Sequence, residues 1–326
     1  MKRRDTIALA VCLGIASVLS GCGQGTEGDD PNEINLAFVA GASTDFWTFA
    51  KRGCEKADQE LEDVSIEFRF TTDGTAVEQR RVLEDLQTRG VDGLAVTPLD
   101  PGNQGPLIDQ LARQIPVVIT DSDIPDSQRR CYVGTNNVDA GREAGRLLKD
   151  VLPDGGKVML FVGKKDAQNA KERIEGLAEV IQDTQIQIVD IRTDDIDRVR
   201  AKANVNDTLV KYPDIECFVG LWSYNGPAIL SALKDAGKLG KVKVVCFDEE
   251  DDTLQGIKDG YIYASVVQQP FEFGYRAMHL LAEIVTGDTS SVPPGKQIII
   301  PTRVIKQDDV AEFMQKIQAL RRGESI

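Results

Sequence analysis

The chain has 326 residues, with 38 lysines and arginines, 52 aspartates and glutamates and one histidine, which gives a formal net charge of −14. An acidic chain lacks the basic surface that nucleic-acid binding requires, and a single histidine, His279, cannot supply a metal site of several histidine ligands. A hydrophobic content of 41% and a charged content of 28% are ordinary for a soluble globular protein of about two domains.

The first residues have the features of an export signal. Met1–Arg4 carries three basic residues, and the apolar run Ile7–Leu19 is shorter than the roughly 20 residues that span a bilayer. The run ends in Leu-Ser-Gly-Cys22, which is similar to the bacterial lipobox, and this resemblance implies cleavage before Cys22 and lipidation of its thiol. The alternatives are a simple secretory signal or a short anchor helix. We expect a signal peptide over residues 1–21, a flexible tether over 22–31 and attachment to a membrane.

Short apolar runs then alternate with amphipathic runs along the rest of the chain. The pattern predicts strands at Ile34–Ala40, Ser65–Thr71, Gly93–Thr97, Pro116–Thr120, Cys131–Gly134, Lys157–Gly163, Ile186–Ile191, Cys217–Gly220, Val242–Phe247 and Tyr261–Val267. It predicts helices at Phe46–Leu61, Ala76–Arg89, Asn103–Arg113, Asp139–Val151, Ala167–Gln182, Ile196–Lys211, Gly226–Ala236 and Phe271–Thr286. This alternation indicates an α/β fold of βαβ units with parallel sheets covered on both faces. The strands are too many for one flavodoxin-like sheet, so we expect two.

The tail and the cysteines indicate packing. Gln307–Arg321 is amphipathic, with Val310, Phe313, Ile317 and Leu320 on one face, and we expect this helix to pack on the second half of the chain. A helix that binds a partner is the alternative. The four cysteines after the predicted tether lie in apolar runs or on a helix face and are expected to be reduced core thiols, namely Cys54, Cys131, Cys217 and Cys246.

Several motifs are absent from the sequence. No Cys-x-x-Cys pair occurs, so a redox or zinc site has no support. No Gly-x4-Gly-Lys-Ser/Thr occurs, so the chain has no ATP-hydrolysing P-loop of this form. The acidic run that starts at Asp248 lacks the alternating oxygen ligands of a calcium loop. We therefore expect neither a metal nor a cofactor.

Polar and aromatic residues follow the predicted strands. In open α/β sheets, ligands bind beyond the carboxyl ends of the strands. The residues at those positions are Asp45-Phe46-Trp47, Thr97, Asp121, Asp123, Lys164–Lys171, Asp194–Arg198, Trp222, Asp248 and Gln268. Aromatic rings can pack on the C–H faces of a sugar, while carboxylates, amides and a guanidinium satisfy its hydroxyls. The set therefore favours a polyhydroxy ligand.

Seven motifs in order resemble one family. They are Asn35-Leu-Ala-Phe-Val with Asp45-Phe46-Trp47, Gly90-Val-Asp-Gly-Leu-Ala-Val-Thr97-Pro98, Ile115-Pro-Val-Val-Ile-Thr-Asp121, Val133-Gly-Thr-Asn-Asn137, Asn169-Ala-x-x-Arg173-x-x-Gly176, Val244-Val-Cys-Phe-Asp248 and Ser265-Val-Val-Gln268-Gln-Pro270. Together they resemble the type I periplasmic sugar-binding proteins, the ribose-binding group, over about Ile34 to Val304.

The resemblance implies a fold and a function. Two doubly wound lobes would be joined by a three-strand hinge, with passages near Thr135, Gln268–Pro270 and Ile298. The N-terminal lobe would be residues 32–135 plus 269–297, and the C-terminal lobe 136–268 plus 298–326. The protein would capture a sugar or polyol by hinge closure and deliver it to the membrane permease of an ABC transporter. The alternative is a ligand-sensing subunit that presents its closed form to a membrane receptor or kinase.

The same resemblance implies the character and location of the protein. It would be a monomeric binding protein rather than an enzyme, without a nucleic-acid partner, in the periplasm or at the cell surface. A glycosidase that uses Asp121 and Asp248 as a carboxylate pair is the enzymatic alternative.

The resemblance also implies the binding residues. Phe46 and Trp47 match an aromatic pair, Asp121 and Asp248 two carboxylates, Arg198 an arginine and Gln268 a hinge glutamine. Lys171 falls where ribose binders commonly have arginine. Thr44, Thr97 and Trp222 replace asparagines, and an indole donates one hydrogen bond and accepts none. These departures favour a larger or differently oriented sugar or polyol over ribose.

Overall fold

The structure is a computed structural model that describes residues 33–42, 44–72 and 74–323. The predicted signal peptide (1–21), the Cys22 lipidation site and the tether (22–31) lie outside the described residues. The first elements are β1 (Ile34–Ala42), α1 (Asp45–Glu60), β2 (Val64–Thr71), α2 (Ala76–Arg89), β3 (Gly93–Val96), α3 (Pro101–Ala112), β4 (Val117–Thr120) and β5 (Cys131–Gly134).

The alternation continues through the rest of the chain. The next elements are α4 (Asn137–Val151), β6 (Gly156–Val162), α5 (Gln168–Ile181), β7 (Ile186–Thr193), α6 (Arg198–Lys211), β8 (Cys217–Gly220), α7 (Asn225–Asp235), β9 (Lys243–Phe247), α8 (Asp251–Lys258) and β10 (Ala264–Val267). The last elements are α9 (Pro270–Val285), β11 (Gln297–Ile299), β12 (Arg303–Ile305) and α10 (Val310–Arg321).

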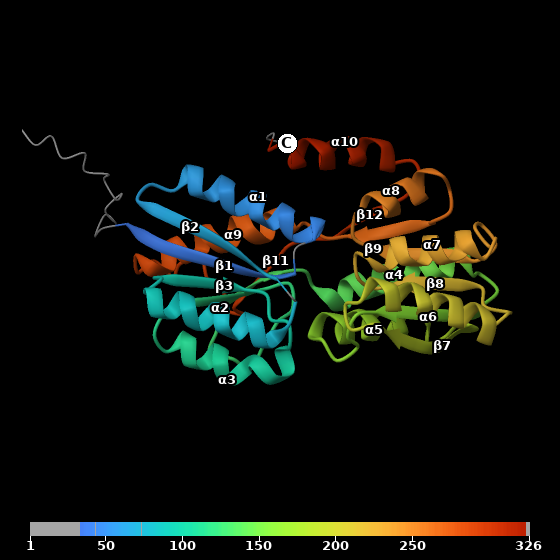
Figure 1. Cartoon of the computed structure of the whole chain (residues 1–326), viewed down its shortest axis with the longest axis horizontal. Coiled ribbons are helices and arrows are strands. Elements are labelled where there is room, and N and C mark those ends of the chain that lie inside the picture. Colours follow the sequence, from blue (N-terminus) through green and yellow to red (C-terminus); the bar gives the residue numbers. More distant parts are fainter. Residues whose placement is uncertain (1–32, 43, 73, 324–326) are drawn as a thin grey trace, which may run out of the picture. The chain divides into compact units, whose positions relative to one another are not determined.

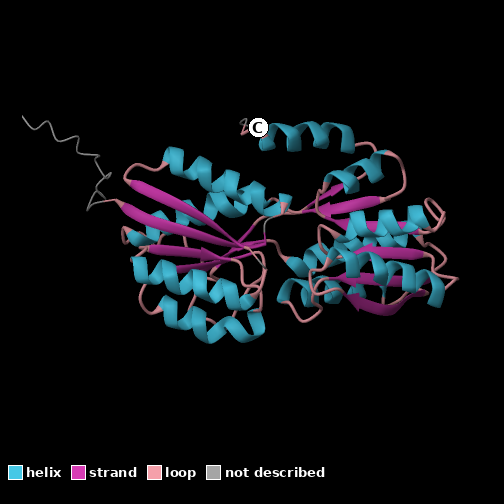
Figure 2. Ribbon diagram, viewed as in Figure 1, coloured by secondary structure: helices cyan, strands magenta, loops and turns pink. Residues whose placement is uncertain are grey.

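The strands form two six-stranded sheets, one in each lobe (Figures 1 and 2). The first has the order β11-β5-β4-β3-β1-β2 and the second β12-β10-β9-β8-β6-β7. Every adjacent pair is parallel except β10 and β12, which are antiparallel. The predicted fold class, two doubly wound parallel-sheet lobes, is confirmed.

Alternating residues of each strand pack on opposite faces of the sheet, and this explains the apolar runs. In β1, Leu36 and Phe38 pack toward α1 and α9, whereas Ala37 and Val39 pack toward α2 and α3. The second sheet is covered in the same way, by α4 and α5 on one face and by α6, α7, α8 and α10 on the other. Because a strand buried on both faces needs apolar residues at every position, its sequence reads as continuous rather than alternating.

The chain passes between the lobes three times. The passages lie between β5 and α4, between β10 and α9, and between β11 and β12. The expected boundary at residues 297/298 cuts through β11, which pairs with β5 through Ile299. The Ile300 N–H still donates to the Gly134 carbonyl at 2.8 Å, and the next residue, Pro301, has no N–H with which to extend the ladder. We therefore propose that the third passage lies at Pro301–Thr302.

The predicted tail helix is present as α10. Val310 and Ile317 are buried in the core of the second lobe, as expected. The helix also contacts α1 of the first lobe, which the sequence did not indicate. Cys54, Cys131, Cys217 and Cys246 are buried free thiols. Within the described residues, no helix is long and apolar enough to cross a membrane.

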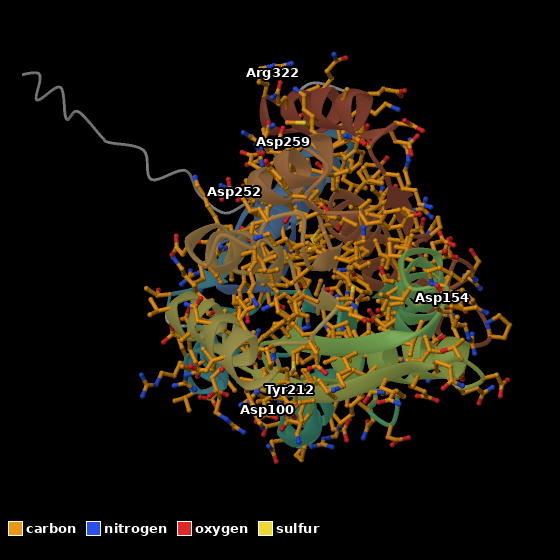
Figure 3. The ribbon with its side chains drawn as sticks, turned by 90° about the vertical axis from the view of Figure 1, so that its right-hand side faces the viewer. Asp100, Asp154, Tyr212, Asp252, Asp259 and Arg322 are labelled. Carbon is orange, nitrogen blue, oxygen red and sulfur yellow. The ribbon has the colours of Figure 1, made fainter. Side chains whose placement is uncertain are left out.

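The exposed charges lie outside these layers. The labelled side chains of Asp154, Asp252 and Asp259 lie at the periphery of the molecule in Figure 3 and are exposed. They therefore belong to the solvated surface and not to either core.

One close helix pair in each lobe depends on glycines. A Cβ at Gly53 or Gly274 would lie 2.0 Å from a backbone oxygen of the opposite helix in the α1–α9 pair. In the α4–α5 pair, a Cβ at Gly176 would lie 1.9 Å from the Val138 carbonyl oxygen. Since real Cβ atoms do not approach so closely, these glycines allow the helices to pack backbone against backbone.

We predict that Gly176→Ala separates α4 from α5 and destabilises the protein by about 1–3 kcal/mol, because the added methyl group overpacks a close contact. Gly295→Ala is the matched control: a Cβ added there would meet no atom within 4 Å, and the φ of Gly295 is not in the left-handed range. We expect its free energy of unfolding to stay within about 0.5 kcal/mol of the wild type. Chemical denaturation measures both values, and equal stabilities of the two variants would contradict this packing.

Candidate functional site

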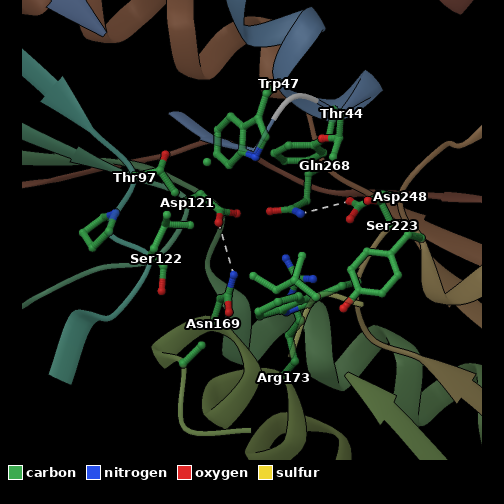
Figure 4. A pocket seen from close by; sticks show the side chains of 18 residues that line it. Thr44, Trp47, Thr97, Asp121, Ser122, Asn169, Arg173, Ser223, Asp248 and Gln268 are labelled. Carbon is green, nitrogen blue, oxygen red and sulfur yellow. Dashed lines mark hydrogen bonds between the residues drawn. The ribbon is translucent and has the colours of Figure 1, made fainter. Parts of the chain in front are cut away.

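A cavity of about 120 Å³ lies where the carboxyl ends of both sheets meet (Figure 4). The first lobe contributes the segments after β1, β3 and β4, and the second lobe those after β6, β7, β8 and β9, together with the hinge residue after β10. The lining residues are Gly41, Thr44, Phe46, Trp47, Thr97, Pro98, Leu99, Asp121, Ser122, Ala167, Asn169, Arg173, Ile196, Trp222, Ser223, Tyr224, Asp248 and Gln268. This is the position at which open α/β sheets hold ligands.

Most of the predicted ligand residues line this cavity. These are Thr44, Phe46, Trp47, Thr97, Asp121, Trp222, Asp248 and Gln268. Their convergence follows from the fold, because each follows the end of a parallel strand. Asp123, which also follows a strand, instead forms a buried ion pair with Arg129 at 2.5 Å.

Lys171 and Arg198 do not line the cavity. Lys171 is exposed on α5, whereas Arg173, two residues further, is buried and reaches the cavity. Two residues correspond to about 200° of rotation on a helix, so they lie on opposite faces. Arg198 forms a paired contact with Glu250 at 2.7 and 3.0 Å, and its guanidinium lies 5.5 Å from the Tyr224 ring. These two placements correct the sequence interpretation.

The sequence prediction named neither cavity residue of α5 as a ligand residue: Asn169 lies within the broader range Lys164–Lys171, and Arg173 only within a family motif. They are four residues apart, so they share one helix face. Both belong to the Asn-Ala-x-x-Arg-x-x-Gly motif, which by itself indicates the fold and assigns neither residue to the site. The helical spacing was the signal that could have found them.

Two buried carboxylates face the cavity from different lobes. Asp121 follows β4 and Asp248 follows β9, and their exposed fractions are 8% and 4%. Burial is the largest cause that raises the pKa of Asp121 to about 6, with a further increase from the charge of Asp248. Burial also raises the pKa of Asp248. The positive charge of Arg173 opposes both increases.

The backbone at both carboxylates is left-handed, with φ of 60° at Asp121 and 64° at Asp248. Aspartate tolerates this region better than most residues, and such conformations are concentrated at functional sites. Each carboxylate accepts a hydrogen bond from an amide that also lines the cavity, Asn169 Nδ2 at 3.2 Å for Asp121 and Gln268 Nε2 at 2.9 Å for Asp248 (Figure 4). The Asn169–Asp121 hydrogen bond joins the two lobes.

Arg173 is held rigidly from the second lobe. Its side chain is 1% exposed, Nε donates to Asn137 Oδ1 at 2.9 Å and Nη1 donates to the Leu221 carbonyl at 2.6 Å. Its guanidinium lies 4.5 Å from the centre of the Phe247 ring. The remaining nitrogen, Nη2, is buried and has no hydrogen-bond partner among the described residues, so it can donate to a ligand.

Four other buried polar atoms of the lining also have no partner among the described residues. Ser122 Oγ and Trp222 Nε1 can donate, and Asn169 Oδ1 and Gln268 Oε1 accept. Buried polar groups in native proteins are nearly always hydrogen-bonded. A set of unpaired donors and acceptors around one cavity therefore indicates a ligand that offers both.

Aromatic rings form two walls of the cavity, one in each lobe. Phe46 and Trp47 make an edge contact, with ring centres 4.8 Å apart, and Trp222 and Tyr224 do the same at 6.5 Å. The chain has two tryptophans, so both line the cavity, and they do so from different lobes.

A buried carboxylate in the second lobe positions two of the cavity loops. Asp194 is fully buried, and it accepts hydrogen bonds from the Tyr224 hydroxyl, from Asn225 Nδ2 at 3.2 Å and from the Ile196 N–H at 3.0 Å. Ile196 has φ of 68°, which is strained for a β-branched residue. Asp194 therefore holds a strained loop against the cavity.

This chain belongs to the periplasmic binding protein family, because the family model described as "Periplasmic binding protein domain" matches residues 36–289 of the chain. The chain is 29% identical over 251 residues to the ribose import binding protein RbsB of Bacillus subtilis, which covers 76% of this chain and 80% of that protein. Its relatives are binding proteins rather than enzymes. The family to which the chain belongs indicates a periplasmic or extracytoplasmic location.

Two solved structures are similar to this chain. GanP, a glucose-galactose binding protein from Geobacillus stearothermophilus, is 30% identical with a TM-score of 0.80, over 85% of this chain and 98% of GanP. A solute-binding protein from Burkholderia graminis, solved in complex with D-arabinose, is 29% identical with a TM-score of 0.80, over 86% of this chain and 97% of that one.

We predict that Asp121→Asn stabilises the ligand-free protein at neutral pH. The folded pKa of about 6 exceeds the ordinary value of 3.8, so the folded state binds the proton more tightly and the stability of the wild type falls as the pH rises through this window. The asparagine cannot ionise, so above pH 6 it removes the cost of burying a charged Asp121, which is up to about 3 kcal/mol. Below pH 4 it should change the free energy of unfolding little, because Asp121 is then protonated. Thermal unfolding across this pH range measures the difference.

Asp123→Asn is the matched control for Asp121→Asn. It breaks the buried pair with Arg129 and should destabilise the protein by about 3–5 kcal/mol at neutral pH. If Asp121→Asn were as destabilising as this control, the idea that the buried negative charge of Asp121 destabilises the folded protein would be excluded.

Proposed function

We propose that the protein captures a neutral sugar or polyol between its two lobes and delivers it to the membrane permease of an ABC transporter. The observation that carries this proposal is the set of buried, unpaired donors and acceptors between two aromatic walls. A polyhydroxy molecule satisfies such a set because each hydroxyl both donates and accepts. The sugar-binding relatives support the same class of ligand.

The size and charge of the cavity narrow the ligand further. A volume of about 120 Å³ is below the roughly 300 Å³ at which pockets for larger small molecules begin, so a monosaccharide or cyclitol is favoured. A ligand carboxylate or phosphate would lie against Asp121 and Asp248, whose burial already disfavours their negative charge. We therefore propose an uncharged ligand.

Each binding residue has a proposed role. Asp121, Asp248, Asn169 and Gln268 accept from the hydroxyls of the ligand, and Arg173 donates to them. Phe46, Trp47 and Trp222 pack on its C–H faces, and Thr44 and Thr97 contact its edge. Thr97 Oγ1 is already hydrogen-bonded to Thr120 Oγ1 at 2.6 Å, so it contributes mainly shape.

Binding works by hinge closure. Contacts from both lobes form together only in the closed arrangement, so the ligand favours that arrangement by its differential contacts. In this proposal the lipid on Cys22 keeps the monomer at the membrane, where the permease receives the closed form. A membrane receptor or kinase in place of the permease would make the same chain a sensor.

A thermal-shift screen of pentoses, hexoses, inositols and sugar alcohols tests the ligand class. A ligand present at about 100 times its Kd adds about 2.7 kcal/mol to the stability, and titration of tryptophan fluorescence should follow closure because both tryptophans line the cavity. If no sugar or polyol raised the unfolding temperature, the proposal would fail. Uptake of the ligand in a permease deletion strain separates transport from sensing.

We predict that Arg173→Met weakens binding of the identified sugar at least 100-fold, because it removes a donor and the cation that balances two buried carboxylates. Lys171→Met is the matched control: it removes a positive charge from the exposed face of the same helix and should change the Kd less than about twofold. Calorimetric titration measures both, and circular dichroism verifies that each variant is folded. Equal loss of affinity in the two variants would remove Arg173 from the site.

A further inference from the structure

The last turn of α10 reaches both lobes (Figure 1). The helix is packed into the core of the second lobe through Val310 and Ile317, and it contacts α8 of that lobe and α1 of the first. It begins beyond residue 289, where the match to the family profile ends. Its final residue, Arg321, lies where the two lobes approach each other.

Arg321 makes ion pairs with both lobes. Its Nη1 donates to both carboxylate oxygens of Asp251, each at 2.8 Å, and its Nη2 donates to Asp45 Oδ2 at 3.0 Å. The guanidinium lies 5.7 Å from the Phe49 ring, and the Arg321 carbonyl accepts from Arg52 Nη2 at 3.1 Å. The side chain of Arg321 is 28% exposed and those of Asp45 and Asp251 are 57% and 65% exposed, so water and salt screen these pairs and each contributes modestly.

The two partners of Arg321 adjoin the ligand cavity. Asp45 is the first residue of α1 and lies between Thr44 and Phe46, which line the cavity. Asp251 is the first residue of α8, three residues after Asp248. Both carboxylates are at helix N-termini, where negative charge is favourable. One guanidinium thus connects a site segment of the first lobe to a site segment of the second.

An apolar contact accompanies these ion pairs. Phe49 belongs to α1 of the first lobe, yet it is 2% exposed and packs in the hydrophobic cluster of the second lobe that also contains Val310 and Ile317. Separation of the lobes would remove this ring from the cluster and break the Asp45 contact. The interface between α1 and α10 is therefore a second contact between the lobes, apart from the cavity.

We infer that Arg321 is a positioning residue for ligand binding: it stabilises the closed arrangement of the lobes and raises ligand affinity without touching the ligand. This inference rests on the proposed function. For a ligand that binds only the closed form, the apparent Kd is the intrinsic Kd divided by the fraction of protein that is closed. Loss of Arg321 decreases that fraction, so the affinity falls although every cavity residue is unchanged.

The test compares Arg321→Met with Lys316→Met in the full chain. Lys316 pairs with Glu312 of the same helix at 2.7 Å, so its substitution removes the same charge from α10 but breaks an ion pair within the helix and not the pair to Asp45. We expect Arg321→Met to weaken binding of an uncharged sugar by about three- to tenfold, mainly through faster dissociation, and Lys316→Met by less than about twofold. Wild-type affinity for this neutral ligand should fall with ionic strength, and that dependence should shrink in Arg321→Met.

A double-mutant cycle locates the effect between the lobes. Asp45→Asn should weaken binding by itself but add little in the Arg321→Met background, because the pair is already broken. A merely structural role of Arg321 would instead lower the unfolding temperature and leave the affinity, its salt dependence and the coupling to Asp45 unchanged. That result would overturn the inference.

Ligand-free measurements separate this inference from the proposed function. Without any sugar, Arg321→Met should have a larger radius of gyration than the wild type and a red-shifted tryptophan emission, since opening exposes Trp47 and Trp222. Lys316→Met should match the wild type in both. If no sugar bound the wild-type protein, the proposed function would fail while these readouts still decided the role of Arg321. Identical ligand-free values for Arg321→Met and the wild type would overturn it.

Discussion

The site depends on one buried cation between two buried carboxylates. Arg173 opposes the increased pKa of both Asp121 and Asp248, which come from different lobes. Its position is determined by Asn137, by the Leu221 carbonyl and by the Phe247 ring. Because isolated buried charges are costly, the two carboxylates can face one cavity only with this guanidinium nearby. In the closed arrangement the Asp121 and Asp248 carboxylates repel each other, and the positive charge of Arg173 reduces the cost of this repulsion.

Two of the contacts between the lobes differ in physical character. In the cavity the contacts are polar and incomplete, since several buried donors and acceptors have no partner within the described chain. At the α1–α10 interface, two contacts form without a ligand: Phe49 is packed, and Arg321 is paired with both lobes. The first contact needs a ligand to become favourable, whereas the second does not. In the binding mechanism that we propose, the closed arrangement thus has a constant contribution from α10 and a ligand-dependent contribution from the cavity.

The fold could be predicted from the sequence because its cause is local. Runs such as Val117–Thr120 and Val244–Phe247 are apolar at nearly every position, and strands covered on both faces require that pattern. The carboxyl ends of such strands converge, so the order of strands along the chain is enough to assign Asp121, Trp222 and Asp248 to one site. The strands β11 and β12 escape prediction because each has three residues, too few for a pattern.

Lys171 and Arg198 were predicted in the site but do not line the cavity, and the cause is different. The residues adjacent in the sequence do not show which partner a side chain contacts in the folded protein. Lys171 and Arg173 differ in the helix face they occupy, and a motif match does not resolve a difference of two residues. Arg198 is a reasonable ligand residue in the sequence because nothing local shows that Glu250, 52 residues later, takes its guanidinium. Arg321 lies 276 residues from Asp45, a pairing that exists only once both lobes are folded and adjacent. Contacts of this range are consequences of the assembled fold. For that reason, a linear analysis does not find Arg321, which we propose stabilises the closed arrangement.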